Sequence, residues 1–361
     1  MTAPDPLLAS ALQVALEADA GSSWRRQPEL AALAFAEVRE RLAAGADVAG
    51  VVSQDLGALL PTQVRYRNST LLALAISYRR LDVAELLIAH GACPTDPKTG
   101  CTSAYREAGG EREMIRFLLR HGADPALFDR EDLPIATGAE LIPEQTVPAD
   151  FPTALFTAQR GLANPQRCTN PFFLDQIRSF DSARRGARRH SPANADASSG
   201  SPVFSFDRFG RTITRLPDGR LVLIAGEHED SYDADFWIYN DVCILGREGS
   251  VDYFLYPMED FPPTDSHTAT LLDDHILIIG CLGYPAQRKE GVTPVHRLDL
   301  DSWRISRVET TGGNPGWIHH HRAELRDGEI RVEGGFIQPD RRPNVGIYAL
   351  TPSTMHWRRI A

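Results

Sequence analysis

The densest group of chemically capable side chains in this 361-residue sequence is the stretch GEHEDSYDADF, residues 226–236. It holds five carboxylates and a histidine: Glu227, His228, Glu229, Asp230, Asp233 and Asp235. Carboxylate oxygens are ligands for hard cations, and a carboxylate within hydrogen-bond reach of a histidine can act in acid/base catalysis. A solvated loop has the same composition, so the meaning of the stretch depends on the elements that position it.

A second group of such residues lies further along the chain. It comprises Asp265, His267, Tyr284, Trp317 and the run His319, His320 and His321. Alternate side chains of a strand point to opposite faces, so at most two of the three consecutive histidines can share a cavity. The sequence contains no nucleophile elbow, phosphate-binding P-loop or dinucleotide glycine motif, which leaves nucleophilic catalysis without support.

Markers in the last 160 residues recur at a nearly constant interval. Gly226, Gly280 and Gly334 each follow an aliphatic run and are 54 residues apart, and His267 and His321 have the same spacing. Each interval has room for about four short strands, which predicts a repeated four-stranded unit of the propeller-blade type.

These runs resemble the kelch motif over residues 203–361. The motif's glycine pair is complete at Gly334-Gly335, its third strand resembles Asn240-Asp241-Val242, and its tryptophan corresponds to Trp303 and Trp357. The resemblance implies an all-β propeller with three recognisable blades. Because propellers normally have at least four blades, either a degenerate fourth blade precedes residue 212 or a partner closes the ring.

In such a blade, the connections between strands two and three and between blades share one face. The long connections all fall on that face: residues 227–239, 282–293 and 336–344, together with 261–267 and 314–321. The connections expected on the other face are tight turns. We therefore expect the acidic stretch to be a loop on a candidate binding face, together with Asp265, His267 and the three histidines.

Four interpretations of this face remain open at the level of sequence. It is a metal site, an acid/base site, a set of local ion pairs with Arg288, Lys289, Arg341 and Arg342, or a protein-recognition surface anchored by Trp237, Tyr284 and Trp317. Interface centres favour aromatic residues and arginine, which favours the last interpretation.

The first third of the chain contains a different repeat. Residues 69–94 and 101–125 align with a step of 31 or 32 residues, and each copy ends a helical pattern with His-Gly-Ala, where glycine can adopt the left-handed conformation that ends a helix. This pattern resembles the ankyrin repeat, which implies a stack of helix pairs that binds proteins on its concave, loop-bearing side. A weaker copy ends at residues 42–47, and the N-terminal helix is expected to cap the stack.

Residues 126–200 are expected to connect the two regions. The segment NPFFLDQIRSFDSARRGARRH, residues 170–190, predicts one amphipathic helix whose terminal arginines either complement the helix dipole or bind an acidic partner. The stretch SPANADASSGS, residues 191–201, is typical of a flexible linker.

Composition limits the remaining possibilities. A formal net charge of −10 argues against a general nucleic-acid binder, since such proteins neutralise phosphates with Lys and Arg. The five cysteines form no C-x-x-C pair, the N-terminus does not resemble a secretion signal, and no apolar run is long enough for a membrane helix. We expect a cytoplasmic protein with reduced thiols.

Taken together, the sequence predicts a multidomain α + β protein: an ankyrin-like stack at 1–125, a connector at 126–200 and a kelch-like propeller at 201–361. The predicted function is recognition of a protein partner, with a basic partner favoured by the acidic charge, and neutralisation of a toxin by an immunity protein is one specific form of it. The alternative is an enzyme or metal protein that uses the acidic and histidine residues. We assign no catalytic residue, metal ligand or cofactor.

Overall fold

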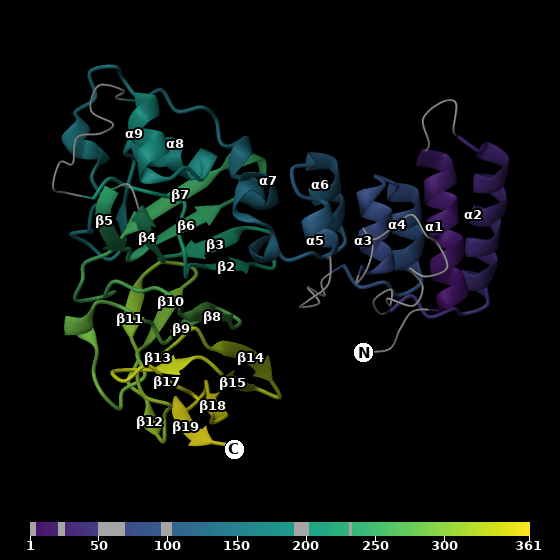
Figure 1. Cartoon of the computed structure of the whole chain (residues 1–361). Coiled ribbons are helices and arrows are strands. Elements are labelled where there is room, and N and C mark those ends of the chain that lie inside the picture. Colours follow the sequence, from purple (N-terminus) through teal and green to yellow (C-terminus); the bar gives the residue numbers. More distant parts are fainter. Residues whose placement is uncertain (1–4, 21–25, 50–68, 95–102, 191–201, 231–232) are drawn as a thin grey trace. The chain divides into compact units, whose positions relative to one another are not determined.

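The computed structural model describes residues 5–20, 26–49, 69–94, 103–190, 202–230 and 233–361; at residues 230, 233–235 and 247 only the backbone is described. The chain divides into two compact units, 1–136 and 137–361, which we call the helical unit and the sheet unit. Helices thus precede many-stranded sheets, as the sequence predicts, and none of the described sheets closes into a barrel (Figure 1). No helix among the described residues has the length and apolar character needed to span a membrane.

The helical unit is built from helices that follow one another in pairs. They are α1 (Pro6–Ala20), α2 (Pro28–Ala43), α3 (Leu71–Ser77), α4 (Leu81–Ala89), α5 (Ala104–Glu107) and α6 (Arg112–Arg120), followed by α7 (Leu133–Thr137) at the boundary between the units. The first helix of each pair lies beside the first helix of the next, α1 beside α3 and α3 beside α5. Their apolar faces form one continuous core that includes Leu12, Leu74 and Ile115.

Equivalent residues begin and end the second and third helix pairs. The side chain of Thr70 accepts a hydrogen bond from the backbone N–H of Ala73, and Ser103 accepts one from Arg106. Helices α4 and α6 both end before a glycine with positive φ, Gly91 at 98° and Gly122 at 89°. The glycine conformation predicted from the sequence is therefore confirmed.

The sheet unit contains three large antiparallel sheets. The first sheet consists of β2 (Thr212–Arg215), β3 (Leu221–Ile224), β6 (Asp241–Leu245) and β7 (Val251–Leu255), with β1 (Gln166–Arg167) on its outer edge. The second sheet consists of β8 (Thr268–Leu271), β9 (His275–Ile279), β10 (Val295–Asp299) and β11 (Ile305–Arg307). The third sheet consists of β14 (Arg322–Arg326), β15 (Glu329–Glu333), β18 (Tyr348–Thr351) and β19 (His356–Arg359), with β12 (Thr311–Gly312) on its outer edge. In each sheet the four main strands follow one another in chain order. The first strands of the sheets are neighbours in space, because β2 lies beside β8 and β8 lies beside β14.

Smaller elements fill the connections. These are the hairpin β4 (Glu227–Asp230) and β5 (Asp233–Ile238), the small sheet β13 (Ile318–His319), β16 (Phe336–Ile337) and β17 (Arg342–Pro343), and the 3-10 turns η3 (Pro125–Leu127), η4 (Arg130–Asp132), η5 (Ala139–Leu141), η6 (Thr153–Phe156), η8 (Arg247–Gly249) and η9 (Pro285–Gln287).

The middle sheet is buried on both faces, which explains the continuous hydrophobic run of β9. Ile276 and Ile278 belong to a core shared with Ile224 and Val242 of the first sheet. Leu277 and Ile279 point the other way and belong to a core shared with strands of the third sheet. Because successive side chains of β9 point to opposite faces of the sheet, this strand joins the three sheets into one stack.

The two ends of this stack differ in chemistry. On the outer face of the third sheet, β14 and β15 place arginines opposite glutamates: Arg322 opposite Glu333, Glu324 opposite Arg331 and Arg326 opposite Glu329. A charge-paired face ends a repeat array without exposing apolar surface. The first sheet is instead covered by aromatic side chains from the preceding segment, among them Phe173 and Phe204, which pack on Tyr253.

The segment before the first sheet is part of the sheet unit. The single helix predicted for residues 170–190 is wrong, because it divides into α8 (Pro171–Ser179) and α9 (Ala183–His190). Phe180 between them has a φ of 51°, a left-handed conformation that ends α8. The arginine-rich end of α9 folds back onto α8, where Arg189 forms an ion pair with Asp175 at 2.7 Å. The predicted linker at 191–201 lies outside the described residues.

Candidate functional site

The acidic stretch forms a β-hairpin, so its prediction as a loop is wrong. Strands β4 and β5 pair with Glu227 opposite Ile238 and His228 opposite Trp237. The hairpin forms because β5 ends in Phe-Trp-Ile, residues that favour strands, and because the backbone of Glu227 also bonds to Phe209 on its other side. Glu227 is half-buried and Glu229 is exposed. The side chains of Asp230, Asp233 and Asp235 lie outside the described structure.

His228 of the hairpin points into the protein. Its side chain is only 3% exposed, and its Nδ1 lies 2.8 Å from the hydroxyl of Tyr239. That hydroxyl also accepts a hydrogen bond from the N–H of Ser205. Burial, aided by the charge of Arg208, lowers the pKa of His228 to about 3. The imidazole is therefore neutral and serves the packing of the hairpin base.

His267 and His321 occupy equivalent positions and make equivalent contacts. The Nε2 of His267 lies 2.9 Å from the hydroxyl of Thr212 on the preceding sheet, and the Nε2 of His321 lies 2.9 Å from that of Thr268. Burial, with smaller contributions from neighbouring histidines, lowers their pKa values to about 3 and about 4. Each histidine thus links the first strands of two adjacent sheets; we call these two contacts the histidine clasps.

Ser266 and His320 precede the two clasp histidines and have φ values of 53° and 55°, and Gly210 before the first sheet has a φ of 61°. The backbone N–H of Ser266 donates to the carbonyl of Gly210, and the N–H of His320 donates to the carbonyl of Ser266. Asp265, itself buried, accepts a hydrogen bond from the N–H of Gly283 at 2.8 Å, and burial raises its pKa. These residues hold together the ends of strands and loops at one side of the sheet unit.

The three consecutive histidines have three different environments. His319 is 2% exposed and lies between His320, whose Nδ1 is 2.6 Å from its own, and the amide of Gln338. Burial and the adjacent His320 lower the pKa of His319 to about 4. His320 is exposed, and His321 forms a clasp. The left-handed backbone of His320 separates β13 from β14, so simple strand alternation does not apply here.

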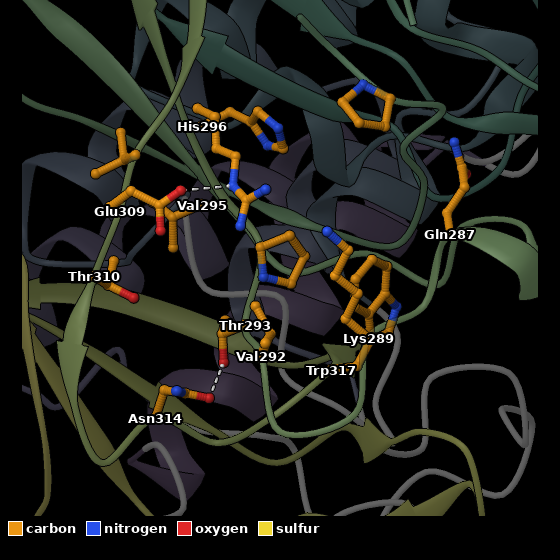
Figure 2. Close-up of a pocket in the computed structure, with 14 residues that line it drawn as sticks. Gln287, Lys289, Val292, Thr293, Val295, His296, Glu309, Thr310, Asn314 and Trp317 are labelled. Carbon is orange, nitrogen blue, oxygen red and sulfur yellow. Dashed lines mark hydrogen bonds and ion pairs between the residues drawn. The ribbon is translucent and has the colours of Figure 1, made fainter. Parts of the chain in front are cut away.

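A cavity of about 400 Å³ lies beside this group. Its wall comes from the connection between β9 and β10 and from the chain that leads from β11 to β13 (Figure 2). Trp317 is almost fully buried in this wall, where its indole N–H donates to the carbonyl of Leu282 at 3.1 Å. Tyr284 lies outside the cavity and ties the same connection to the hairpin, because its hydroxyl accepts a hydrogen bond from the N–H of Ile238.

The lining combines an apolar wall with a few polar groups. Apart from Trp317, the wall consists of Pro262, Val292, Pro294, Val295 and Val308, and the polar groups are Gln287, Lys289, Thr293, His296, Arg307, Glu309, Thr310 and Asn314. Figure 2 shows Trp317 and Lys289 on one side of the cavity and Glu309, Thr310 and Asn314 on the other. The hydroxyl of Thr293 donates to the carbonyl of Gly316 at 2.7 Å and lies 3.1 Å from the Oδ1 of Asn314, which ties the two chain segments together.

The charged groups of the cavity are not equally paired. Arg307 and Glu309 form an ion pair at 3.1 Å. Lys289 is exposed and has no ion-pair or hydrogen-bond partner for its side chain among the described residues. His296 is only 6% exposed; burial and the charge of Arg307 lower its pKa to about 4, so the imidazole that lines the cavity is neutral.

The residues predicted as a site differ from those that line the cavity. Among the predicted residues whose side chains are described, Trp317 alone lines the cavity, while His228, Asp265, His267, His319 and His321 are buried with partners in the protein. The cavity residues Lys289, His296 and Arg307 were not predicted as a site. Two long adjacent connections were the available signal, because both contribute to the wall.

Known metal-binding geometries and known families add no assignment. Within the described ranges, no group of three or more His, Cys, Asp or Glu side chains is arranged to hold a metal ion. No protein-family model matches the chain, and no curated protein matches its sequence.

Proposed function

We propose that this chain is an interaction protein that binds a protein partner at the cavity of the sheet unit. The observation that carries the proposal is the preformed cavity with Trp317 buried in its wall. An aromatic side chain held by a hydrogen bond, with apolar neighbours and a polar rim, is the composition of a binding hot spot. The cavity does not depend on a mobile side chain, because Thr293, Asn314 and Trp317 are all fixed by hydrogen bonds within the protein.

We further propose that the two units belong to the ankyrin-like and kelch-like classes. Helix pairs with equivalent caps support the first assignment, and three sheets of the same strand order with equivalent clasps support the second. Both classes bind proteins, so two recognition surfaces on one chain would raise avidity through effective concentration. The concave side of the helical unit is part of this proposal, although its connections at 50–68 and 95–102 lie outside the described residues.

The overall charge of −10 favours a basic partner, because opposite charge accelerates association. Neutralisation of a basic toxin is one specific form of the proposal. In that form, co-expression of this chain would rescue growth of cells that express the toxin.

The proposal is tested with one variant that fills the cavity. Thr310 is half-buried and lines the cavity, so Thr310→Trp should fill it. Ser353 is an exposed small residue in the turn between β18 and β19, outside the cavity lining, so Ser353→Trp is the control for adding a tryptophan elsewhere on the sheet unit.

A partner captured by the full chain should be purified and its affinity measured by calorimetry. We expect Thr310→Trp to weaken binding by at least about tenfold and Ser353→Trp to leave it unchanged. Equal affinities for the two variants would disprove the assignment of the cavity.

A further inference from the structure

The outer edge of the second sheet is capped at one residue by a side chain from a distant part of the sequence. The amide of Asn164 donates to the carbonyl of Ile305 at 2.6 Å and accepts from its N–H at 2.9 Å. An adjacent strand would make the same pair of hydrogen bonds. Ile305 of β11 therefore directs its backbone polar groups outward, away from β10.

The same outward direction applies two residues later, at Arg307. In the antiparallel pair of β10 and β11, the N–H of Asp299 donates to the carbonyl of Arg304, and the N–H of Val308 donates to the carbonyl of Val295. Every second residue from Arg304 onward therefore bonds to β10. Arg307 lies opposite His296, in a non-bonded pair like that of Ile305 and Leu298. Its N–H and C=O point outward and meet no partner among the described residues.

Two hollows follow one another along this edge. The cavity of about 400 Å³ is lined by residues 307–310 of the strand and its continuation, and a second hollow of about 500 Å³ is lined by residues 302 and 304–307. Arg307 lines both. The unpaired backbone groups of Arg307 thus lie at the edge that the two hollows share, and exposed strand edges accept added strands.

The interior of the cavity specifies what such a peptide would carry. Its apolar wall suits an aromatic or leucine side chain, and His296, only 6% exposed as a residue, makes no side-chain hydrogen bond among the described residues. Lysine occurs only twice in the sequence, at Lys98 and Lys289, against 36 arginines. The unpaired Lys289 on the rim places a compact positive charge there, which favours a carboxylate.

We propose that the cavity receives an extended segment of the partner protein, which adds as a strand to β11 at Arg307. The segment inserts an aromatic or leucine side chain beside Trp317 and places an aspartate or glutamate near Lys289. Because side chains two residues apart share a face of an extended chain, the pattern is Phe or Leu, any residue, then Asp or Glu. The inference rests on the proposed function and specifies its ligand.

Synthetic hexapeptides provide the probe. The series is acetyl-Thr-X-Thr-Z-Thr-Val-amide, with Phe, Leu or Ala at X and Glu, Gln or Lys at Z. Reductive methylation with ¹³C-formaldehyde gives each of the two lysines its own NMR signal and retains the charge, and Lys289→Arg identifies the signal of Lys289. The signal of Lys98 is the internal reference.

We expect peptides with Phe or Leu at X and Glu at Z to shift the Lys289 signal. Gln at Z should weaken binding about fivefold, as loss of one exposed ion pair of about 1 kcal/mol implies. Moving Glu next to X should have the same effect, Lys289→Glu should reverse the preference to Lys at Z, and Thr310→Trp should abolish binding.

Backbone methylation of the peptide separates strand addition from simple insertion of a side chain. If the peptide pairs with Arg307, N-methylation should abolish binding at the one peptide residue whose N–H donates to the Arg307 carbonyl and leave the neighbouring residues unaffected. Uniform tolerance of N-methylation, or a Lys289 signal that no peptide shifts at millimolar concentration, would overturn the inference. If a protein partner still depended on Thr310 in that case, the proposed function would stand without this ligand.

Discussion

Polar residues of the sheet unit fall into two regions with opposite properties. At the starts of β8 and β14, His267 and His321 recur with the repeat, are buried and bond to threonines of the preceding sheet. In the connections that form the cavity, Lys289 and Trp317 have no counterpart in the other repeats, and Lys289 is exposed and unpaired within the described chain.

The difference shows how a repeat separates structure from recognition. A residue that recurs in successive copies serves a contact that those copies share, such as the contact that joins a copy to its neighbour. A residue present in one copy is free of that constraint and can serve a ligand. Periodic histidines are therefore poor candidates for a site here, and the non-periodic connections are good ones.

The largest expected effect concerns the buried polar network beneath the hairpin. Arg208 and Asp241 form an ion pair at 2.7 Å with both side chains almost fully buried, and the hydroxyl of Tyr253 donates to the same carboxylate at 2.5 Å. Asp241→Asn keeps the volume but leaves the Arg208 charge uncompensated. We expect a loss of about 3–5 kcal/mol in the free energy of unfolding.

The matched control is Asp252→Asn on β7, whose ion pair with Arg167 is exposed and should contribute at most about 1 kcal/mol. Urea unfolding followed by tryptophan fluorescence measures both, since Trp237, Trp303, Trp317 and Trp357 all lie in the sheet unit. If the two variants lost equal stability, the buried pair would not be the structural centre we describe.

The sequence predicts the order of elements well because that order follows from local patterns. Helical spacing and the His-Gly-Ala stops identified α4 and α6, and the 54-residue interval identified the three sheets. It could not predict that Phe180 breaks a helix or that Asn164 caps β11, because neither follows from neighbouring residues. The cavity was missed for the same reason: Lys289, His296 and Arg307 come together only through contacts between sheets and connections.

The histidine clasps are expected to have the next largest effect. His267→Ala removes a buried ring and its hydrogen bond to Thr212, which should cost about 1–3 kcal/mol. A double-mutant cycle with Thr212→Ala should give a coupling of about 0.5–1.5 kcal/mol, because one interaction is lost in both variants. The exposed His356→Ala is the control and should change stability by less than about 0.5 kcal/mol. A coupling near zero would mean that the clasp only fills space.

The smallest effect is the share of one clasp in the response to acid. Burial lowers the pKa of His321 to about 4, below its value of about 6.5 in the unfolded chain. Between these values the unfolded state binds more protons, so the stabilising contribution is complete above about pH 6.5 and is lost as the pH falls toward 4.

His321→Gln removes this titration. The stability difference between the wild type and this variant should therefore shrink by about 1.4 kcal/mol from pH 7.5 to pH 5.5. If the free energy of unfolding of His321→Gln followed that of the wild type in parallel over this pH range, the imidazole would not be buried in its neutral form. The contrast between the histidine clasps and the cavity would then not hold for His321.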